Sequence, residues 1–216
     1  SLLLCIVVFI YASRSEAARL QREELESANR RLRYVTTGKE VDTTMKDPSL
    51  VYHLFLSHVW STGQDQMRVV KQRLMELCPN LTIFLDVDDL KEIGDLEGYV
   101  ARTHTVLIFC TDGYFFSLNC MRELVSTIQK GKPVIALLEP EENKGGLTKE
   151  MIMEHLVSCE EKYENWGLSE QIEGYGWKRP IAQFLYNKLF ESDAIEWNRI
   201  GSEHLTLNTY TNAGLL

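Results

Sequence analysis

The sequence predicts an α/β domain in which helices cover a parallel sheet. Short apolar runs, typical of buried strands, alternate along the chain with segments whose apolar residues recur every three or four positions, as on one face of a helix. Strands that alternate with helices in this way form βαβ units, which have parallel strands and right-handed crossovers. The 216 residues are enough for one domain of ordinary size and marginal for two.

Each element follows from a local pattern. The third apolar run contains the unbroken segment VLIFC, as in a strand buried on both faces. The apolar residues between Met121 and Ile128 share one helical face, and Ser117 precedes them as a capping residue. The expected strands are Tyr52–Ser57, Thr82–Leu85, Thr105–Cys110, Val134–Leu138 and Ile195–Trp197. The expected helices are Gln64–Leu77, Leu96–Ala101, Ser117–Gln129, Glu150–Lys162 and Pro180–Phe190.

Composition excludes several classes of protein. The hydrophobic content of 44% is near the globular average, which argues against a collagen-like, disulfide-stapled or disordered chain. Asp and Glu outnumber Lys and Arg by 31 to 23, and this acidic balance disfavours a nucleic-acid partner. The five cysteines form no CxxC pair and no zinc-like spacing with histidine, so we expect reduced thiols and no metal site.

The N-terminal residues have a different character from the rest. Leu2–Ala12 is uncharged and apolar, about half the ~20 residues of a membrane-spanning helix, and arginines follow it. We therefore expect the C-terminal part of a truncated transmembrane helix, with the following domain on the cytoplasmic side of the membrane. A secretory signal and a buried core helix are the alternatives. The expected regions are this span (1–12), a juxtamembrane helix (13–34), a linker (35–50), the α/β domain (51–200) and a tail (201–216).

Common catalytic fingerprints are missing from the sequence. It contains no GxGxxG, no GxxxxGK[ST] and no GxSxG motif, which disfavours dinucleotide-binding, P-loop and hydrolase classes. The acidic residues Asp86, Asp88 and Asp89, with Asp112, raise the alternative of a phosphoryl-accepting receiver domain that binds Mg²⁺. That class places its acidic pair after the first strand, where Ser57 stands here. The receiver reading is therefore disfavoured.

Glu123 lies in the helix that follows the third strand, near the edge of the sheet where ligands bind. In an open parallel sheet, that edge is formed by the carboxyl ends of the strands. At 100° per residue, Glu123 lies on the face of its helix roughly opposite the apolar residues between Met121 and Ile128. The helical pattern alone therefore predicts a solvated carboxylate.

Four segments, in the correct order and spacing, resemble the motifs of the Toll/interleukin-1 receptor (TIR) domain family. Tyr52–His58 resembles the first box, a strand of the form (Y/F)DxFxS. Phe84–Leu90, followed by Gly94, resembles the second strand and the BB loop. Ser117–Leu124 resembles the S-x-W-C-x-x-E-L helix start of plant-type and bacterial members, and Lys132–Ala136 resembles the fourth strand. The resemblance covers residues 52–138.

The resemblance implies a flavodoxin-like domain with five parallel strands in the order 2-1-3-4-5, flanked by helices. It also implies a cytoplasmic signalling module of a membrane protein, as in innate-immunity-like signalling, that acts by association with other TIR domains, including its own copies. The loop after the second strand is the expected contact surface, with Leu90 and Ile93 as apolar anchors. Asp88, Asp89 and Gly94 complete the expected interaction loop.

The alternative function that the resemblance implies is an NAD⁺ glycohydrolase that releases nicotinamide. Glu123 matches the catalytic glutamate of the enzymatic members, in which a carboxylate stabilises an oxocarbenium-like ribose. NAD⁺ would be the substrate, with no cofactor. The chain departs from the motif at one position, because Asn119 replaces the tryptophan. The expected substrate-binding residues are Ser57, Trp60, Asp86 and Cys120.

Overall fold

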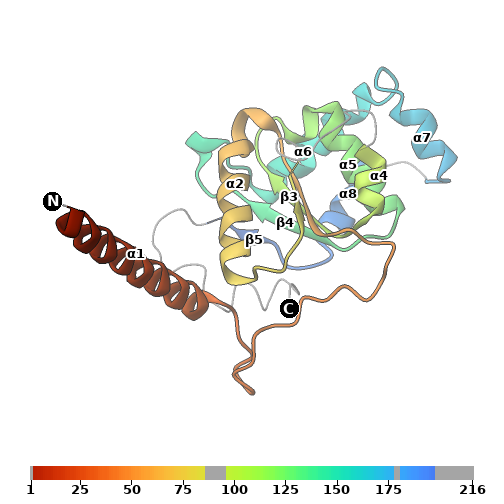
Figure 1. Ribbon diagram of the computed structural model, residues 1–216. Coiled ribbons are helices and arrows are strands. Elements are labelled where there is room, and N and C mark those ends of the chain that lie inside the picture. The colour runs from red at the N-terminus through yellow and green to blue at the C-terminus, as the bar shows by residue number, and fades with distance from the viewer. Residues whose placement is uncertain (1, 86–95, 178–180, 198–216) are drawn as a thin grey trace. The chain divides into compact units, whose positions relative to one another are not determined.

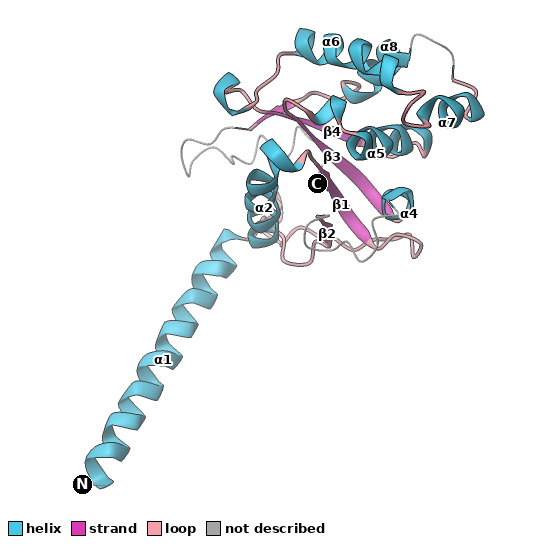
Figure 2. Ribbon diagram, turned by 90° about the horizontal axis from the view of Figure 1, so that it is seen from above, coloured by secondary structure: helices cyan, strands magenta, loops and turns pink. Residues whose placement is uncertain are grey.

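The computed structural model describes residues 2–85, 96–177 and 181–197, with side chains from residue 14 onward. The described residues form two compact units. One comprises residues within 1–43 and 73–80, and the other comprises residues within 44–72 and 81–216. Figure 1 labels the longer helices and strands β3, β4 and β5, and Figure 2 labels β1 and β2.

The larger unit is built on a five-stranded sheet in which every neighbouring pair of strands is parallel. The order β2-β1-β3-β4-β5 confirms the predicted 2-1-3-4-5 topology. Strand β3 begins two residues earlier than expected, and the described part of β2 is only two residues long. The strands are β1 (Tyr52–Ser57), β2 (Ile83–Phe84), β3 (Thr103–Cys110), β4 (Val134–Leu138) and β5 (Ile195–Glu196).

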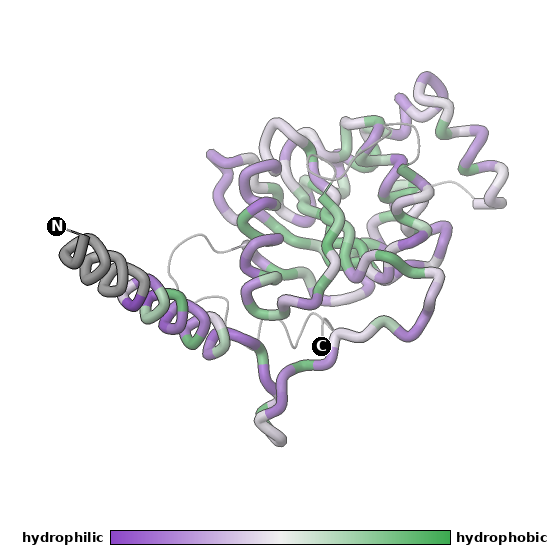
Figure 3. The backbone as a smooth tube through the Cα atoms, viewed as in Figure 1, coloured by the Kyte–Doolittle hydropathy of each residue, from purple (hydrophilic) through white to green (hydrophobic). Residues whose placement is uncertain are grey.

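The middle of the sheet is buried because it is covered on both faces. From Thr105 to Cys110, every residue of β3 is buried, as the unbroken apolar run predicts. On one side of these strands, the rings of Phe55, Phe84 and Tyr99 stack with centroid distances of 4.8 and 4.4 Å. The tube in Figure 3 shows hydrophobic residues gathered along these central strands.

Helices α4, α5, α6 and α8 lie on one side of the sheet, and α2 lies on the other (Figure 2). The start of α5 matches the sequence prediction, because the Ser117 hydroxyl accepts a hydrogen bond from the Cys120 N–H and so caps the helix. Helix α2 begins four residues before the expected position, and α7 was not expected. The helices of this unit are α2 (Trp60–Leu77, which ends in the smaller unit), α4 (Leu96–Ala101), α5 (Leu118–Gln129), α6 (Lys149–Cys159), α7 (Leu168–Gly174) and α8 (Ile181–Leu189). Short 3-10 turns lie at η2 (Tyr114–Phe116), η3 (Glu142–Lys144) and η4 (Glu160–Lys162).

The smaller unit contains one long helix, α1 (Leu2–Arg30), and the end of α2. After α1 the chain turns back on itself, and Glu40 pairs with both Arg31 (3.3 Å) and Arg33 (3.2 Å). The Leu32 N–H donates to the Leu77 carbonyl at 2.9 Å, which joins this segment to the last turn of α2.

None of the helices in the described part of the chain is both long enough and apolar enough to cross a membrane. The membrane location stays a prediction.

Candidate functional site

Glu123 is buried within α5, with only 4% of its surface exposed. The prediction of a solvated carboxylate, which the helical pattern alone makes, is wrong. The reason is that the first turns of α5 are buried on nearly every face of the helix. The other buried residues there are Cys120, Met121, Leu124, Val125, Ser126 and Thr127. A carboxylate in such a place is stable only when hydrogen bonds replace those of water.

Ser57 supplies such a hydrogen bond to Glu123. Its Oγ donates a hydrogen bond to Glu123 Oε2 at a distance of 2.5 Å. Ser57 itself is buried at the carboxyl end of β1. The backbone carbonyl of Glu123 also accepts a hydrogen bond, from Thr127 Oγ1 at 2.6 Å, one turn later in the helix. The structure therefore brings together two of the residues that the sequence analysis selected, from segments far apart in the chain.

Tyr114 completes this buried cluster, and the sequence analysis missed it. Its hydroxyl lies 2.6 Å from Ser57 Oγ and 3.3 Å from the Cys120 carbonyl oxygen, and its ring is fully buried in η2. Burial, the neighbouring Cys120 and the charge of Glu123 raise the pKa of Tyr114 well above its ordinary value. Its hydroxyl therefore remains a hydrogen-bond donor. In the sequence Tyr114 belongs to the aromatic run YFF, which reads as part of an apolar core and gives no signal for a functional hydroxyl.

Cys120 lies beside the same cluster. Its thiol donates to the carbonyl oxygen of His58, the residue after β1, at 3.4 Å. Only 4% of the surface of Cys120 is exposed. Its contact with a substrate stays a prediction.

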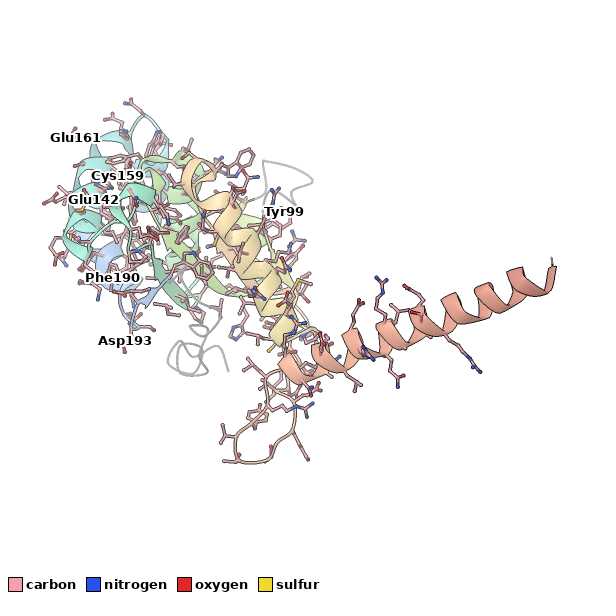
Figure 4. The ribbon with its side chains drawn as sticks, turned by 90° about the vertical axis from the view of Figure 1, so that its left-hand side faces the viewer. Tyr99, Glu142, Cys159, Glu161, Phe190 and Asp193 are labelled. Carbon is pink, nitrogen blue, oxygen red and sulfur yellow. The ribbon has the colours of Figure 1, made fainter. Side chains whose placement is uncertain are left out.

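Trp60 is exposed over 59% of its surface at the start of α2, where it borders a polar pocket of about 570 Å³. The walls come from the start of α2, from Asp112 after β3 and from the turn η3 after β4, whose Glu142 is labelled in Figure 4. The lining residues are Trp60, Ser61, Thr62, Gln64, Asp65, Gln66, Asp112, Glu142, Asn143, Lys144 and Gly145. Ser57, Tyr114 and Glu123 are not among the residues that line this pocket.

The loop after β4 is held by backbone hydrogen bonds and close packing. It contains a second buried carboxylate that the sequence analysis missed. Glu139 is 1% exposed, and its Oε1 accepts the Glu141 N–H at 3.1 Å. The Asp112 N–H donates to the Gly145 carbonyl at 2.8 Å, which ties this loop to the end of β3. At Gly146 a Cβ would lie 2.6 Å from the Glu139 carbonyl oxygen, so only glycine fits without a shift of the backbone.

The remaining expected site residues lie outside the described residues. These are Asp86 and the interaction-loop residues Asp88, Asp89, Leu90, Ile93 and Gly94. Where side chains are described, no group of three or more His, Cys, Asp or Glu residues is arranged to hold a metal ion. The roles of the selected residues therefore stay predictions.

The fold and the buried cluster define a class of protein: a flavodoxin-like α/β domain with a carboxylate enclosed at the carboxyl edge of its sheet. The chain is similar to the TIR domains in the structure of the activated Roq1 resistosome directly recognizing the pathogen effector XopQ. That similarity has a TM-score of 0.50 and 15% sequence identity, and it covers 76% of this chain and 96% of the other. The protein therefore has a TIR-like fold. No protein-family model matches the chain, and no curated protein matches its sequence.

Proposed function

We propose that this TIR-like domain hydrolyses the bond between nicotinamide and ribose in NAD⁺, with Glu123 as the catalytic carboxylate. One observation carries the proposal: Glu123 is 4% exposed and accepts a 2.5 Å hydrogen bond from Ser57 at the carboxyl end of β1. A carboxylate that is merely solvated on a helix surface needs neither burial nor a fixed donor. This edge of a parallel sheet is also where ligands bind in open α/β folds.

The chemistry of the reaction suits a carboxylate in this environment. The bond between the nicotinamide nitrogen and ribose C1′ breaks, and its electron pair leaves with neutral nicotinamide. Positive charge develops on the ribose, where a nearby carboxylate stabilises it. Water then adds to C1′ and loses a proton, which completes ADP-ribose. Because Glu123 is shielded from solvent, its attraction for that charge is stronger than it would be in water.

The proposed substrate contacts are the residues that the sequence analysis selected. Ser57 and Cys120 lie beside Glu123 and would border the reacting end of NAD⁺. The exposed ring of Trp60 offers a stacking surface at the polar pocket. Asp86, which follows the second strand in the sequence, is proposed to contact substrate as well.

A second candidate function is signalling by self-association, with or without turnover of NAD⁺. The similarity to TIR domains of an activated resistosome supports it, as does Asn119, which stands where enzymatic members have tryptophan. The proposed setting is the cytoplasmic side of a membrane, with residues 1–12 as the end of the anchor. The two functions are compatible, because assembly can complete an active site between copies.

The experiment that separates the two functions measures nicotinamide release by the purified chain, both dilute and clustered on a surface through a terminal tag. We expect release by the clustered wild type and a loss of about 10²-fold or more in Glu123→Gln and Glu123→Ala. Glu139→Gln is the matched control, because it neutralises another buried carboxylate at the same edge of the sheet. No release by the clustered wild type would favour a scaffold, and release that survives both Glu123 substitutions would remove Glu123 from the mechanism.

A further inference from the structure

We infer that Tyr114 is a positioning residue that orients the Glu123 carboxylate through Ser57. Three buried polar groups form a chain: Tyr114 OH lies 2.6 Å from Ser57 Oγ, which lies 2.5 Å from Glu123 Oε2. The consequence for catalysis rests on the proposed hydrolysis of NAD⁺, whereas the orientation of the carboxylate does not. Tyr114 itself is not proposed to touch the substrate.

The direction of the two hydrogen bonds follows from counting protons. Ser57 Oγ donates to Glu123 Oε2, and a serine hydroxyl has a single proton. The proton of Ser57 therefore points to Glu123 Oε2, and Tyr114 must be the donor in its contact with Ser57. The contact from Tyr114 OH to the Cys120 carbonyl oxygen is longer, at 3.3 Å, and is secondary because a phenol also has one proton.

Tyr114 is well suited to hold Ser57 in a single orientation. A serine hydroxyl rotates easily, so a second partner is needed to keep its proton directed at one acceptor. The Tyr114 ring is fully buried and packs edge-on against Phe115, with ring centroids 5.1 Å apart. The phenol therefore stays in place and, because its pKa is raised by burial, stays protonated. This fixes one oxygen of Glu123 relative to the end of β1.

The kinetic test is a double-mutant cycle on Ser57 and Tyr114. Tyr114→Phe keeps the ring and removes only the hydroxyl, and we expect kcat to fall about tenfold with KM changed by less than about twofold. In a Ser57→Ala background the same substitution should have little further effect, because Tyr114 acts through Ser57. Ser57→Thr retains the hydroxyl and should restore most of the kcat lost in Ser57→Ala.

Tyr163→Phe is the matched control for this cycle. Tyr163 is another buried tyrosine of the same core, and its hydroxyl accepts a hydrogen bond from the Cys159 thiol at 3.3 Å. We expect Tyr163→Phe to leave kcat unchanged. The inference is overturned if Tyr114→Phe affects kcat no more than Tyr163→Phe does, or if it lowers kcat equally with and without the Ser57 hydroxyl.

A spectroscopic measurement separates failure of this inference from failure of the proposed function. The ¹³C resonance of the Glu123 carboxyl carbon, assigned by its loss in Glu123→Gln, reports the hydrogen bonding of the carboxylate without any turnover. We expect Tyr114→Phe to shift this resonance and Tyr163→Phe to leave it in place. A resonance unmoved by Tyr114→Phe overturns the positioning role, whereas absence of nicotinamide release by the wild type overturns only the hydrolysis.

Discussion

Ser57 Oγ lies 2.5 Å from Glu123 Oε2, although 66 positions separate the two residues in the chain. The contact joins the end of β1 to α5, and both side chains are removed from water. A buried carboxylate that loses a hydrogen-bond donor keeps the cost of desolvation and loses part of the compensation. This pair therefore has consequences for the stability of the domain as well as for its proposed chemistry.

Ser57→Ala should lower the free energy of unfolding by about 1–3 kcal/mol, because it removes a donor to a buried charged group. Urea denaturation at neutral pH measures this difference. Ser158→Ala is the control: its hydroxyl also donates at 2.8 Å, to the Glu154 carbonyl, but on an exposed helix face. Equal losses in the two variants would contradict a special energetic role for the contact between Ser57 and Glu123.

Gly146→Ala should destabilise the domain by about 1–3 kcal/mol, because the added Cβ meets backbone atoms that cannot move without a shift of the loop. The nearest of these, the Glu139 carbonyl oxygen, would lie 2.6 Å away. Gly174→Ala, in α7, meets no atom within 4 Å and should be neutral or slightly stabilising. Thermal unfolding of both variants tests the prediction, which fails if Gly146→Ala is as well tolerated as Gly174→Ala.

Stability should fall at alkaline pH through Cys159. Burial raises the pKa of its thiol from 9.0 to about 11. Between pH 9 and 11 the unfolded chain loses the thiol proton while the folded chain retains it, so the free energy of unfolding decreases as the pH rises. Below pH 9 both states keep the proton and this contribution is constant. Cys159→Ala should show a shallower decline over the same range, and an identical slope in the two proteins would refute the prediction.

Self-association should depend on the loop after β2. Leu90→Ala combined with Ile93→Ala should weaken association, because apolar anchors supply much of the binding energy at protein interfaces. Sedimentation velocity over a range of concentrations measures the effect. Val157→Ala, which removes an exposed apolar side chain on α6, is the control. Unchanged association of a folded double variant would exclude this loop as the contact.

The membrane location predicted from residues 1–12 has a direct test. In a fusion whose added upstream apolar residues complete a span of about 20 residues, the chain should resist extraction from membranes by carbonate, and deletion of residues 1–12 from that fusion should release it, since apolar residues supply the anchoring energy. Deletion of the tail, residues 201–216, is the control. A protease added from the cytosolic side of sealed vesicles should digest the TIR-like domain. Protection of the domain would show that its orientation is the reverse of the expected one.

Much of the fold could be predicted because it depends on local patterns. The continuous apolar run of β3 and the cap at Ser117 appear where they were expected, since each depends on residues close in the chain. The early start of α2 at Trp60 was missed, and so was the short helix α7, in which Leu168 and Ile172 form only one apolar pair four positions apart. The strand order came from the resemblance to the TIR family, and the structure confirms it.

By itself, the sequence determined the alternation of strands and helices and selected Glu123 through the motif around Cys120. Only the tertiary structure decided that Glu123 is buried, that Ser57 donates to it and that Tyr114 and Glu139 lie enclosed at the same edge of the sheet. The physical reason is that the periodicity of a helix shows only which of its residues share a face with its apolar residues. The burial of a side chain depends on which other segments fold against it, and these segments come from distant parts of the chain.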